Sequence, residues 1–167
     1  VMEALKMSAI DKEYMLNKEI GLIVGNDSSA KAIIDGVDTI REKKNTVLVG
    51  SGNVFQSMNS TISMNLAVNL GIKGISMTVS AACASSSHAI GIATMMIRSG
   101  MQERIICAGA QEVNVYSVGS FDGISAFSSK IDTPQEASRA FDKDRDGLVP
   151  SGGGAAIVVE SLKSAKE

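Results

Sequence analysis

Residues 75–98 constrain the fold more than any other part of the chain. They read I-S-M-T-V-S-A-A-C-A-S-S-S-H-A-I-G-I-A-T-M-M-I-R, a β-rich apolar run that passes through small residues around Cys83 into a helical pattern. A cysteine at a strand-to-helix turn lies beside unpaired N–H groups and the positive end of the helix. That setting favours the nucleophilic thiolate. It also places backbone donors near the oxyanion that forms when the thiolate attacks a thioester or ester.

A second interpretation of Cys83 is structural, because free cysteine often packs as a small buried hydrophobe. The side chains that flank Cys83 are all small, so a substrate has room to approach the sulfur. The pattern also resembles the nucleophile elbow of acyl-transfer enzymes, with a thiol in place of the hydroxyl. The residues alone leave both interpretations open.

The rest of the chain alternates between strand and helix patterns. We expect strands at residues 20–25, 75–79, 104–110 and 155–160, helical segments at 1–17, 58–70 and 84–99, and either a helix or a turn-rich segment at 30–44. The last helix has no polar face, so we expect it to be buried, with Gly100 closing it. Strands that alternate with helices predict an α/β fold with a mainly parallel sheet covered on both faces, and we expect one domain over residues 1–167.

Composition excludes several classes of protein. The net charge is −2, which gives no electrostatic basis for binding nucleic acid. No apolar run reaches the length of a membrane span, so we expect no membrane partner. The two cysteines stand at unrelated positions, which indicates a reducing compartment and predicts a cytoplasmic protein.

Three segments together resemble one enzyme family. Residues 80–91 read S-A-A-C-A-S-S-S-H-A-I-G, residues 120–128 read S-F-D-G-I-S-A-F-S, and residues 137–160 read A-S-R-A-F-D-K-D-R-D-G-L-V-P-S-G-G-G-A-A-I-V-V-E. In order and spacing they resemble the β-ketoacyl-[acyl-carrier-protein] synthases, the condensing enzymes of fatty-acid synthesis. The resemblance is strongest to the elongating synthases of types I and II.

The resemblance implies a thiolase-like fold and a role for Cys83 as the acyl-accepting residue. It implies acyl transfer to Cys83 and then decarboxylative Claisen condensation with malonyl-carrier protein, with the Cys83 N–H as one oxyanion donor. The substrates would arrive on the phosphopantetheine of acyl carrier protein, so we expect no resident cofactor and no metal, and a homodimer. Ser28 falls where elongating synthases vary residue size to control substrate length, and Met58 falls at the far end of the acyl tunnel, near the partner subunit.

The resemblance also implies missing parts. The family's first strand and its two catalytic histidines, lysine and glycine-rich loop have no counterpart in this sequence. We therefore expect the N-terminal half of a synthase subunit, able to accept an acyl group slowly but not to condense. The alternatives are another thiolase-fold acyltransferase of polyketide or degradative type, a chain-length partner subunit, and an inactive half-subunit that only dimerises. Cys83 argues against the chain-length subunit, which typically lacks the nucleophile.

Two further residues invite a chemical interpretation. Cys107 lies within I-I-C-A-G-A and is expected to be a core thiol, near the dimer interface according to the resemblance. His88 is the only histidine. On one helix it would lie about 140° around the axis from Cys83. We therefore expect a histidine that is hydrogen-bonded within the core rather than a general base for Cys83.

The charged run at residues 142–147 reads D-K-D-R-D-G, like the opening of an EF-hand loop. The twelfth position of that loop would be Gly153 where a bidentate Glu is required, so we reject calcium binding. We expect Arg139 and Arg145 to pair with the aspartates, or the loop to be simply solvated. The glycines at 152–154 lead into a strand, which favours close packing over a phosphate site. Phe121 and Phe127 are expected in the core.

Overall fold

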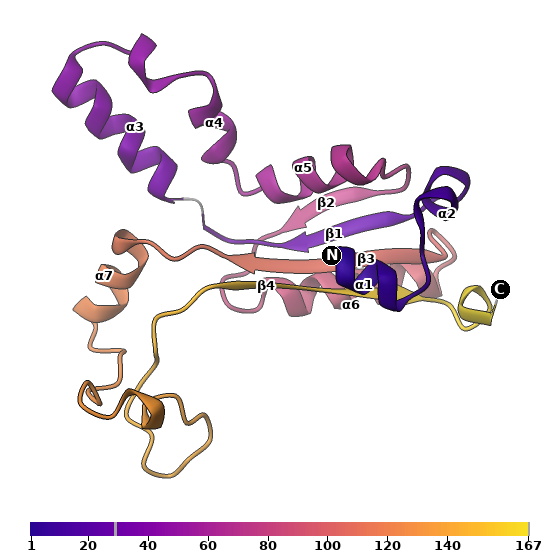
Figure 1. Cartoon of the computed structure of the whole chain (residues 1–167). Coiled ribbons are helices and arrows are strands. Elements are labelled where there is room, and N and C mark those ends of the chain that lie inside the picture. Colours follow the sequence, from indigo (N-terminus) through magenta and orange to yellow (C-terminus); the bar gives the residue numbers. More distant parts are fainter. Residues whose placement is uncertain (29, 167) are drawn as a thin grey trace. The chain divides into compact units, whose positions relative to one another are not determined.

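The computed structural model describes residues 1–28 and 30–166, and its centre is a four-stranded sheet (Figure 1). The strands lie in the order β2-β1-β3-β4, and they are β1 (Gly21–Gly25), β2 (Ser76–Val79), β3 (Arg104–Gln111) and β4 (Gly153–Glu160). β1 pairs in parallel with both β2 and β3. The Ser161 N–H donates to the Glu103 carbonyl at 3.1 Å, so the end of β4 meets the start of β3 and β4 runs antiparallel. The predicted mainly parallel α/β sheet is confirmed.

Most of the helices precede or connect the first three strands, and one helix lies between β3 and β4. They are α1 (Met2–Met7), α2 (Lys12–Asn17), α3 (Ala30–Lys43), α4 (Gly52–Gln56), α5 (Thr61–Leu70), α6 (Ser85–Arg98) and α7 (Val115–Gly123). Short 3₁₀ turns are η1 (Val47–Val49), η2 (Pro134–Glu136) and η3 (Ser164–Lys166). None of the helices in the described ranges combines the length and the apolar character that a bilayer crossing requires.

The chain divides into two compact units. The first comprises Val1–Gln111 and Gly154–Glu167 and contains the sheet with α1 to α6, and the second comprises Glu112–Gly153 and contains α7 and η2. The candidate nucleophile Cys83 therefore belongs to the first unit.

The alternation of side chains along the central strands divides the core of the first unit into two layers. Leu22 and Val24 of β1 face a cluster that includes residues of α1, α2 and α5. Ile23 of β1, together with Ile105 and Cys107 of β3, faces α6 instead. Figure 1 shows α5 and α6 on opposite faces of the sheet. Buried side chains of this size each stabilise the fold by about 1.5–3 kcal/mol, so both layers anchor the sheet.

The amino-terminal segment differs from the single helical segment predicted over residues 1–17. It forms two short helices separated by a turn in which Ala9 has φ 54°. The Asp11 side chain accepts the Tyr14 N–H at 2.7 Å and so starts α2 as its N-cap. Beyond the break Leu16 is exposed and Met15 is buried, so the prediction of one helical segment over residues 1–17 was wrong. The overlooked signal was the capping aspartate.

Helix α6 is buried along one stripe only. Ser85, Ala89 and Ala93 are buried against the sheet, whereas His88 and Ile90 are exposed. The expectations of a helix buried on all sides and of a core histidine at 88 were therefore wrong. Ile90 and Met95 are apolar but exposed, because an apolar residue does not by itself show that another element covers its face of the helix. The predicted closure at Gly100 is confirmed, because this residue has φ 75° and lies just beyond the helix.

Candidate active site

Cys83 lies in the turn between the end of β2 and the start of α6, and its side chain is exposed. The turn is sharp: Ala82, the residue before Cys83, has φ 48°, a left-handed conformation that is unfavourable for a residue with a Cβ. A nucleophile elbow uses such a strained turn to project its reactive side chain out of the chain. The predicted location and accessibility of Cys83 are confirmed, and a buried structural thiol at this position is excluded.

The turn is braced from inside by Ser85, the first residue of α6. The Ser85 hydroxyl accepts the Ala81 N–H at 2.8 Å and donates to the Ala82 carbonyl at 2.7 Å. The Ser85 backbone N–H also donates to the Ala82 carbonyl, at 3.1 Å. Ala84, which directly precedes α6, has no side-chain oxygen to cap the helix. Ser85 therefore organises the turn, although it was not predicted from the sequence.

Two glycines on neighbouring strands bring α6 close to the sheet. Gly25 ends β1 and is paired with Gly109 of β3. A Cβ added at Gly25 would lie 2.5 Å from the Ser85 carbonyl carbon and 2.6 Å from the Ser86 Cα. A Cβ added at Gly109 would lie 3.0 Å from the Ser86 Cβ. The first turn of α6 thus rests on a surface without side chains, which sets the height of the elbow above the sheet.

Hydrogen bonds join the segments that carry Ser28 and Met58 to the strand that leads to Cys83. The Asn59 amide donates to the Asp27 carbonyl at 3.1 Å and to the Ser80 hydroxyl at 3.4 Å. The Asn26 amide donates to the Asn59 carbonyl at 2.9 Å. The loop after β1, the connection between α4 and α5, and the end of β2 therefore meet at the carboxyl edge of the sheet.

Ser28 and Met58 themselves occupy different environments. Ser28 is half-buried, and its hydroxyl accepts a hydrogen bond from the Gln111 amide at 3.3 Å. Met58 precedes α5 rather than belonging to it, and 40% of its surface is exposed. The helical segment predicted at 58–70 is confirmed for Ile62, Leu66 and Leu70, which pack on the core, whereas Met58 lies before its first residue. Asn59 was not predicted from the sequence, where its polar side chain next to Met58 was the available signal.

The second cysteine has the opposite environment. Cys107 is buried in β3, and its thiol lies 3.8 Å from the Ala89 carbonyl. Burial raises the pKa of this thiol to about 11, because an apolar surrounding disfavours the thiolate. The prediction of a core thiol is confirmed, and Cys107 does not compete with Cys83 as a nucleophile near neutral pH.

The second unit contains the charged turn that follows Phe141. Asp146 accepts hydrogen bonds from the Ser128 hydroxyl at 2.8 Å and from the Ser129 N–H at 3.0 Å, and it pairs with Arg139 at 3.3 Å. These bonds, first of all the one from Ser128, lower the pKa of Asp146 to about 2. The predicted ion pair is thus confirmed for Arg139. Arg145 instead donates to the Asp142 backbone carbonyl at 2.8 Å.

The two phenylalanines of this unit differ in part from the prediction. The Phe121 and Phe127 rings contact each other, with 6.3 Å between their centroids. Phe121 is nevertheless exposed over 43% of its surface, so its assignment to the core was wrong within the described structure. Phe127 is half-buried and lies in the segment that pairs with Leu148. The two rings pack on each other without forming an enclosed core.

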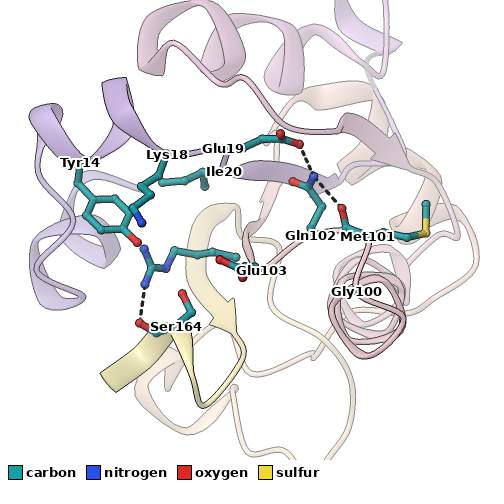
Figure 2. Close-up of a pocket in the computed structure, with 10 residues that line it drawn as sticks. Tyr14, Lys18, Glu19, Ile20, Gly100, Met101, Gln102, Glu103 and Ser164 are labelled. Atoms are coloured by element: carbon teal, nitrogen blue, oxygen red, sulfur yellow. Dashed lines mark hydrogen bonds between the residues drawn. The ribbon is translucent and has the colours of Figure 1, made fainter. Parts of the chain in front are cut away.

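A pocket of about 240 Å³ lies at the opposite, amino-terminal edge of the sheet (Figure 2). Arg104 is buried there, with its guanidinium over the Tyr14 ring at 4.5 Å and a paired Glu160 carboxylate at 2.5 Å. Its guanidinium also donates to the Ser164 carbonyl at 3.0 Å. Because the charge of Arg104 is already paired, and because its guanidinium joins β3 to α2 through the Tyr14 ring and to β4 and η3 through hydrogen bonds, this cluster stabilises the fold and does not resemble a reactive centre.

The fold and the elbow together define a thiolase-like α/β protein. The chain belongs to the β-ketoacyl synthase family, since residues 1–165 match the family described as "Beta-ketoacyl synthase, N-terminal domain". The chain is 36% identical over 165 residues to the 3-oxoacyl-[acyl-carrier-protein] synthase 1 of Haemophilus influenzae, with 98% of this chain and 41% of that protein covered. It is 38% identical over 154 residues to the protein of the same name from Escherichia coli K12, with 91% and 38% covered.

Solved structures agree with this assignment. A β-ketoacyl synthase from Burkholderia phymatum superposes with a TM-score of 0.81 at 31% sequence identity, over 99% of this chain and 42% of that one. The ishigamide ketosynthase/chain length factor superposes with a TM-score of 0.83 at 22% identity and supports the fold alone. The chain spans about two fifths of the length of the curated relatives that it matches.

Proposed function

We propose that this chain supplies the acyl-accepting nucleophile of a condensing enzyme of fatty-acid synthesis. The Cys83 thiolate attacks the carbonyl of an acyl thioester, the new carbon–sulfur bond forms, and the carrier thiol leaves. Malonyl-carrier protein then loses carbon dioxide, and the resulting carbanion attacks the acyl-Cys83 carbonyl. A carbon–carbon bond forms, the bond to the Cys83 sulfur breaks, and the β-ketoacyl carrier is released with the thiolate regenerated.

The observation that carries this proposal is the exposed Cys83 on a left-handed turn, in a chain that matches the family over residues 1–165. The condensation step is proposed for the whole protein, because this chain spans about two fifths of its relatives. The alternative of a chain-length subunit is disfavoured by an accessible thiol at the elbow.

We further propose acyl carrier protein as the partner that delivers the substrates. The relatives are named 3-oxoacyl-[acyl-carrier-protein] synthases. A structurally similar type II polyketide ketosynthase is described in complex with its acyl-carrier protein, at 23% identity and a TM-score of 0.78. The two cysteines are free, which fits a reducing compartment, and we place the reaction in the cytoplasm.

Ser28 and Met58 are proposed to line the path of the acyl chain. The hydrogen bonds of Asn59 support the proposal, because they connect both neighbourhoods to the strand that precedes Cys83. Enlarging the side chain in Ser28→Phe should shorten the longest acyl group that Cys83 accepts. A series of acyl thioesters of increasing length, scored by the mass of the adduct, tests this expectation. An unchanged length profile in both Ser28→Phe and Met58→Trp would contradict it.

We also propose that the protein pairs with a second copy of itself. Ile33, Val37 and Ile40 form an exposed apolar stripe on α3, at helical spacing. β2 lies at one end of the described sheet, where a further strand can pair. Sedimentation equilibrium should give a mass of twice the chain, and Val37→Glu should shift it toward the monomer. A monomer at all concentrations would reject the pairing.

The role of Cys83 is tested by incubating the folded chain with carrier protein that is loaded with an acyl group, and by mapping the acyl adduct by mass spectrometry. We expect one acyl group on Cys83, none in Cys83→Ala, and an unchanged adduct in Cys107→Ala. Cys107 is the matched control because it is the other free thiol and is buried. A folded wild-type chain without an adduct on Cys83 would reject the proposed role.

A further inference from the structure

We propose that Ser85 is a positioning residue for acyl transfer, and that its hydroxyl aims the Cys83 N–H at the developing oxyanion. The inference rests on the proposed role of Cys83 as the acyl acceptor. The Ser85 side chain points into the turn, since Ser85 is 4% exposed, while Cys83 is exposed.

The peptide unit that links Ala82 to Cys83 connects the two residues on which the geometry depends. Its carbonyl oxygen belongs to Ala82 and its N–H belongs to Cys83, and none of the described peptide bonds is cis. In a trans peptide the N–H and the C=O point in opposite directions. The Ser85 hydroxyl donates to the Ala82 carbonyl at 2.7 Å, and the Ser85 N–H donates to the same oxygen at 3.1 Å. Holding that oxygen fixes the direction of the Cys83 N–H.

The same hydroxyl also holds the chain on the other side of the strained residue. It accepts the Ala81 N–H at 2.8 Å, so the peptide unit that precedes Ala81 and the peptide unit that follows Ala82 are both attached to one oxygen atom. A left-handed alanine persists only where the surrounding structure enforces it. A serine hydroxyl can donate one hydrogen bond while it accepts another, which an alanine side chain cannot do.

Orientation matters because an oxyanion donor lowers the barrier only when it is already aimed at the developing charge. Loss of the Ser85 hydroxyl would leave the Ala82 carbonyl with its backbone donor alone and would free the Ala81 N–H. The Cys83 sulfur would remain exposed and able to react, but its own N–H would be less well directed. Acyl transfer, which forms an oxyanion, should therefore suffer more than alkylation at sulfur, which forms none.

A merely structural role for Ser85 makes a different prediction, and Ser63 provides the matched control. Ser63 is also 4% exposed, and its hydroxyl also makes two hydrogen bonds, to the Ser60 carbonyl at 2.9 Å and to the Thr78 hydroxyl at 2.7 Å. It lies on α5, and its two partners, Ser60 and Thr78, both precede the turn at residues 80–84. Ser63→Ala should cost similar stability and leave the Cys83 N–H undisturbed.

The experiment compares wild type, Ser85→Ala, Ser85→Thr and Ser63→Ala in the full chain. Two rates are measured at Cys83 across pH: acylation by an acyl thioester and alkylation by iodoacetamide, both with thermal unfolding as a check of the fold. We expect Ser85→Ala to acylate about tenfold more slowly while its alkylation rate changes less than about threefold. We expect Ser85→Thr, which keeps the hydroxyl, and Ser63→Ala to retain both rates within about threefold.

Equal losses of acylation and alkylation in Ser85→Ala, or no loss of acylation, would overturn the positioning role. If Ser85→Ala does not fold, Ser85→Thr and Ser85→Val are compared by the same criterion, since they share a shape and differ in the hydroxyl. A wild-type chain that is alkylated but never acylated rejects the function proposed for Cys83 and this inference with it. A wild-type chain that is acylated, with Ser85→Ala acylated equally fast, rejects the inference alone.

Discussion

Replacing Gly25 by alanine should displace the first turn of α6 and impair the elbow. The added Cβ would lie 2.5 Å from the Ser85 carbonyl carbon and 2.6 Å from the Ser86 Cα. Both atoms belong to backbone, so no side-chain rotation can relieve the contact. Real Cβ atoms do not approach other carbons this closely, so the helix or the strand must move. Overpacking of a well-packed core typically costs 1–3 kcal/mol, and we expect about 3 kcal/mol for Gly25→Ala because backbone must shift.

Two other glycines provide comparisons for the expected stability cost of Gly25→Ala. At Gly109 the Cβ would meet the side chain of Ser86, whose hydroxyl can rotate away, and the Ser86 Cβ lies at 3.0 Å. We expect a smaller cost of about 1 kcal/mol for Gly109→Ala. Gly91 lies within α6 with no atom near its added Cβ. Gly91→Ala should instead stabilise the chain by about 0.5–1 kcal/mol, because alanine favours the helix.

Urea denaturation of the three variants gives the order of stability, and the rate of iodoacetamide labelling at Cys83 reports on the elbow. We expect the order Gly91→Ala, wild type, Gly109→Ala, Gly25→Ala from most to least stable. The labelling rate should change only in the two variants that touch Ser85 or Ser86. The reasoning is refuted if Gly25→Ala is as stable as wild type and labels at the same rate, since α6 would then not rest on the strand as described.

The remaining predictions concern other charged and thiol groups. Arg104→Met should cost about 3 kcal/mol in urea denaturation, because it leaves the Glu160 carboxylate without its partner, and Glu160→Gln in the same chain should restore part of the loss. The folded-state pKa of Asp146 is lowered, so its carboxylate stabilises the fold above about pH 4, and this contribution is lost as pH falls toward about 2. Asp146→Asn should remove that part of the acid transition in a pH titration followed by circular dichroism. Burial holds the pKa of the Cys107 thiol near 11, so at pH 8 this cysteine should be alkylated at least about 100-fold more slowly than Cys83, and similar rates in the folded chain would contradict its burial.

The strands and the elbow were predictable because their signals are local. The apolar runs at 20–25, 75–79 and 104–110 match β1, β2 and β3 within a residue or two. Small residues around Cys83 allow a tight turn, and the position before a helix follows from adjacent sequence alone. Cys107 was predictable for the same reason, since a thiol within a continuous apolar strand is buried on both faces of a parallel sheet.

The errors arose where exposure depends on a distant neighbour. Phe121 and His88 are exposed, although apolar or helical context suggested a covered position. Periodicity tells which residues share a helix face, but not whether another element covers that face. The break at Ala9 was missed for a different reason, because the N-cap of α2 outweighed a continuous helical pattern.

The residues that shape the elbow share a property that single-sequence patterns do not report. Gly25, Gly109 and Ser85 are ordinary in their local sequence, and their importance follows from contacts between β1, β3 and the first turn of α6. Cys83 was predicted because its chemistry is unusual. The residues that hold it in place are small: the two glycines lack a Cβ where α6 packs, and the Ser85 hydroxyl joins two backbone groups. An elbow at a strand-to-helix turn therefore requires two kinds of position: a reactive side chain that the sequence reveals, and close-packed residues beneath the turn that only the folded chain reveals. Substitution of those close-packed residues should change the reaction rates at Cys83 without altering the thiol itself.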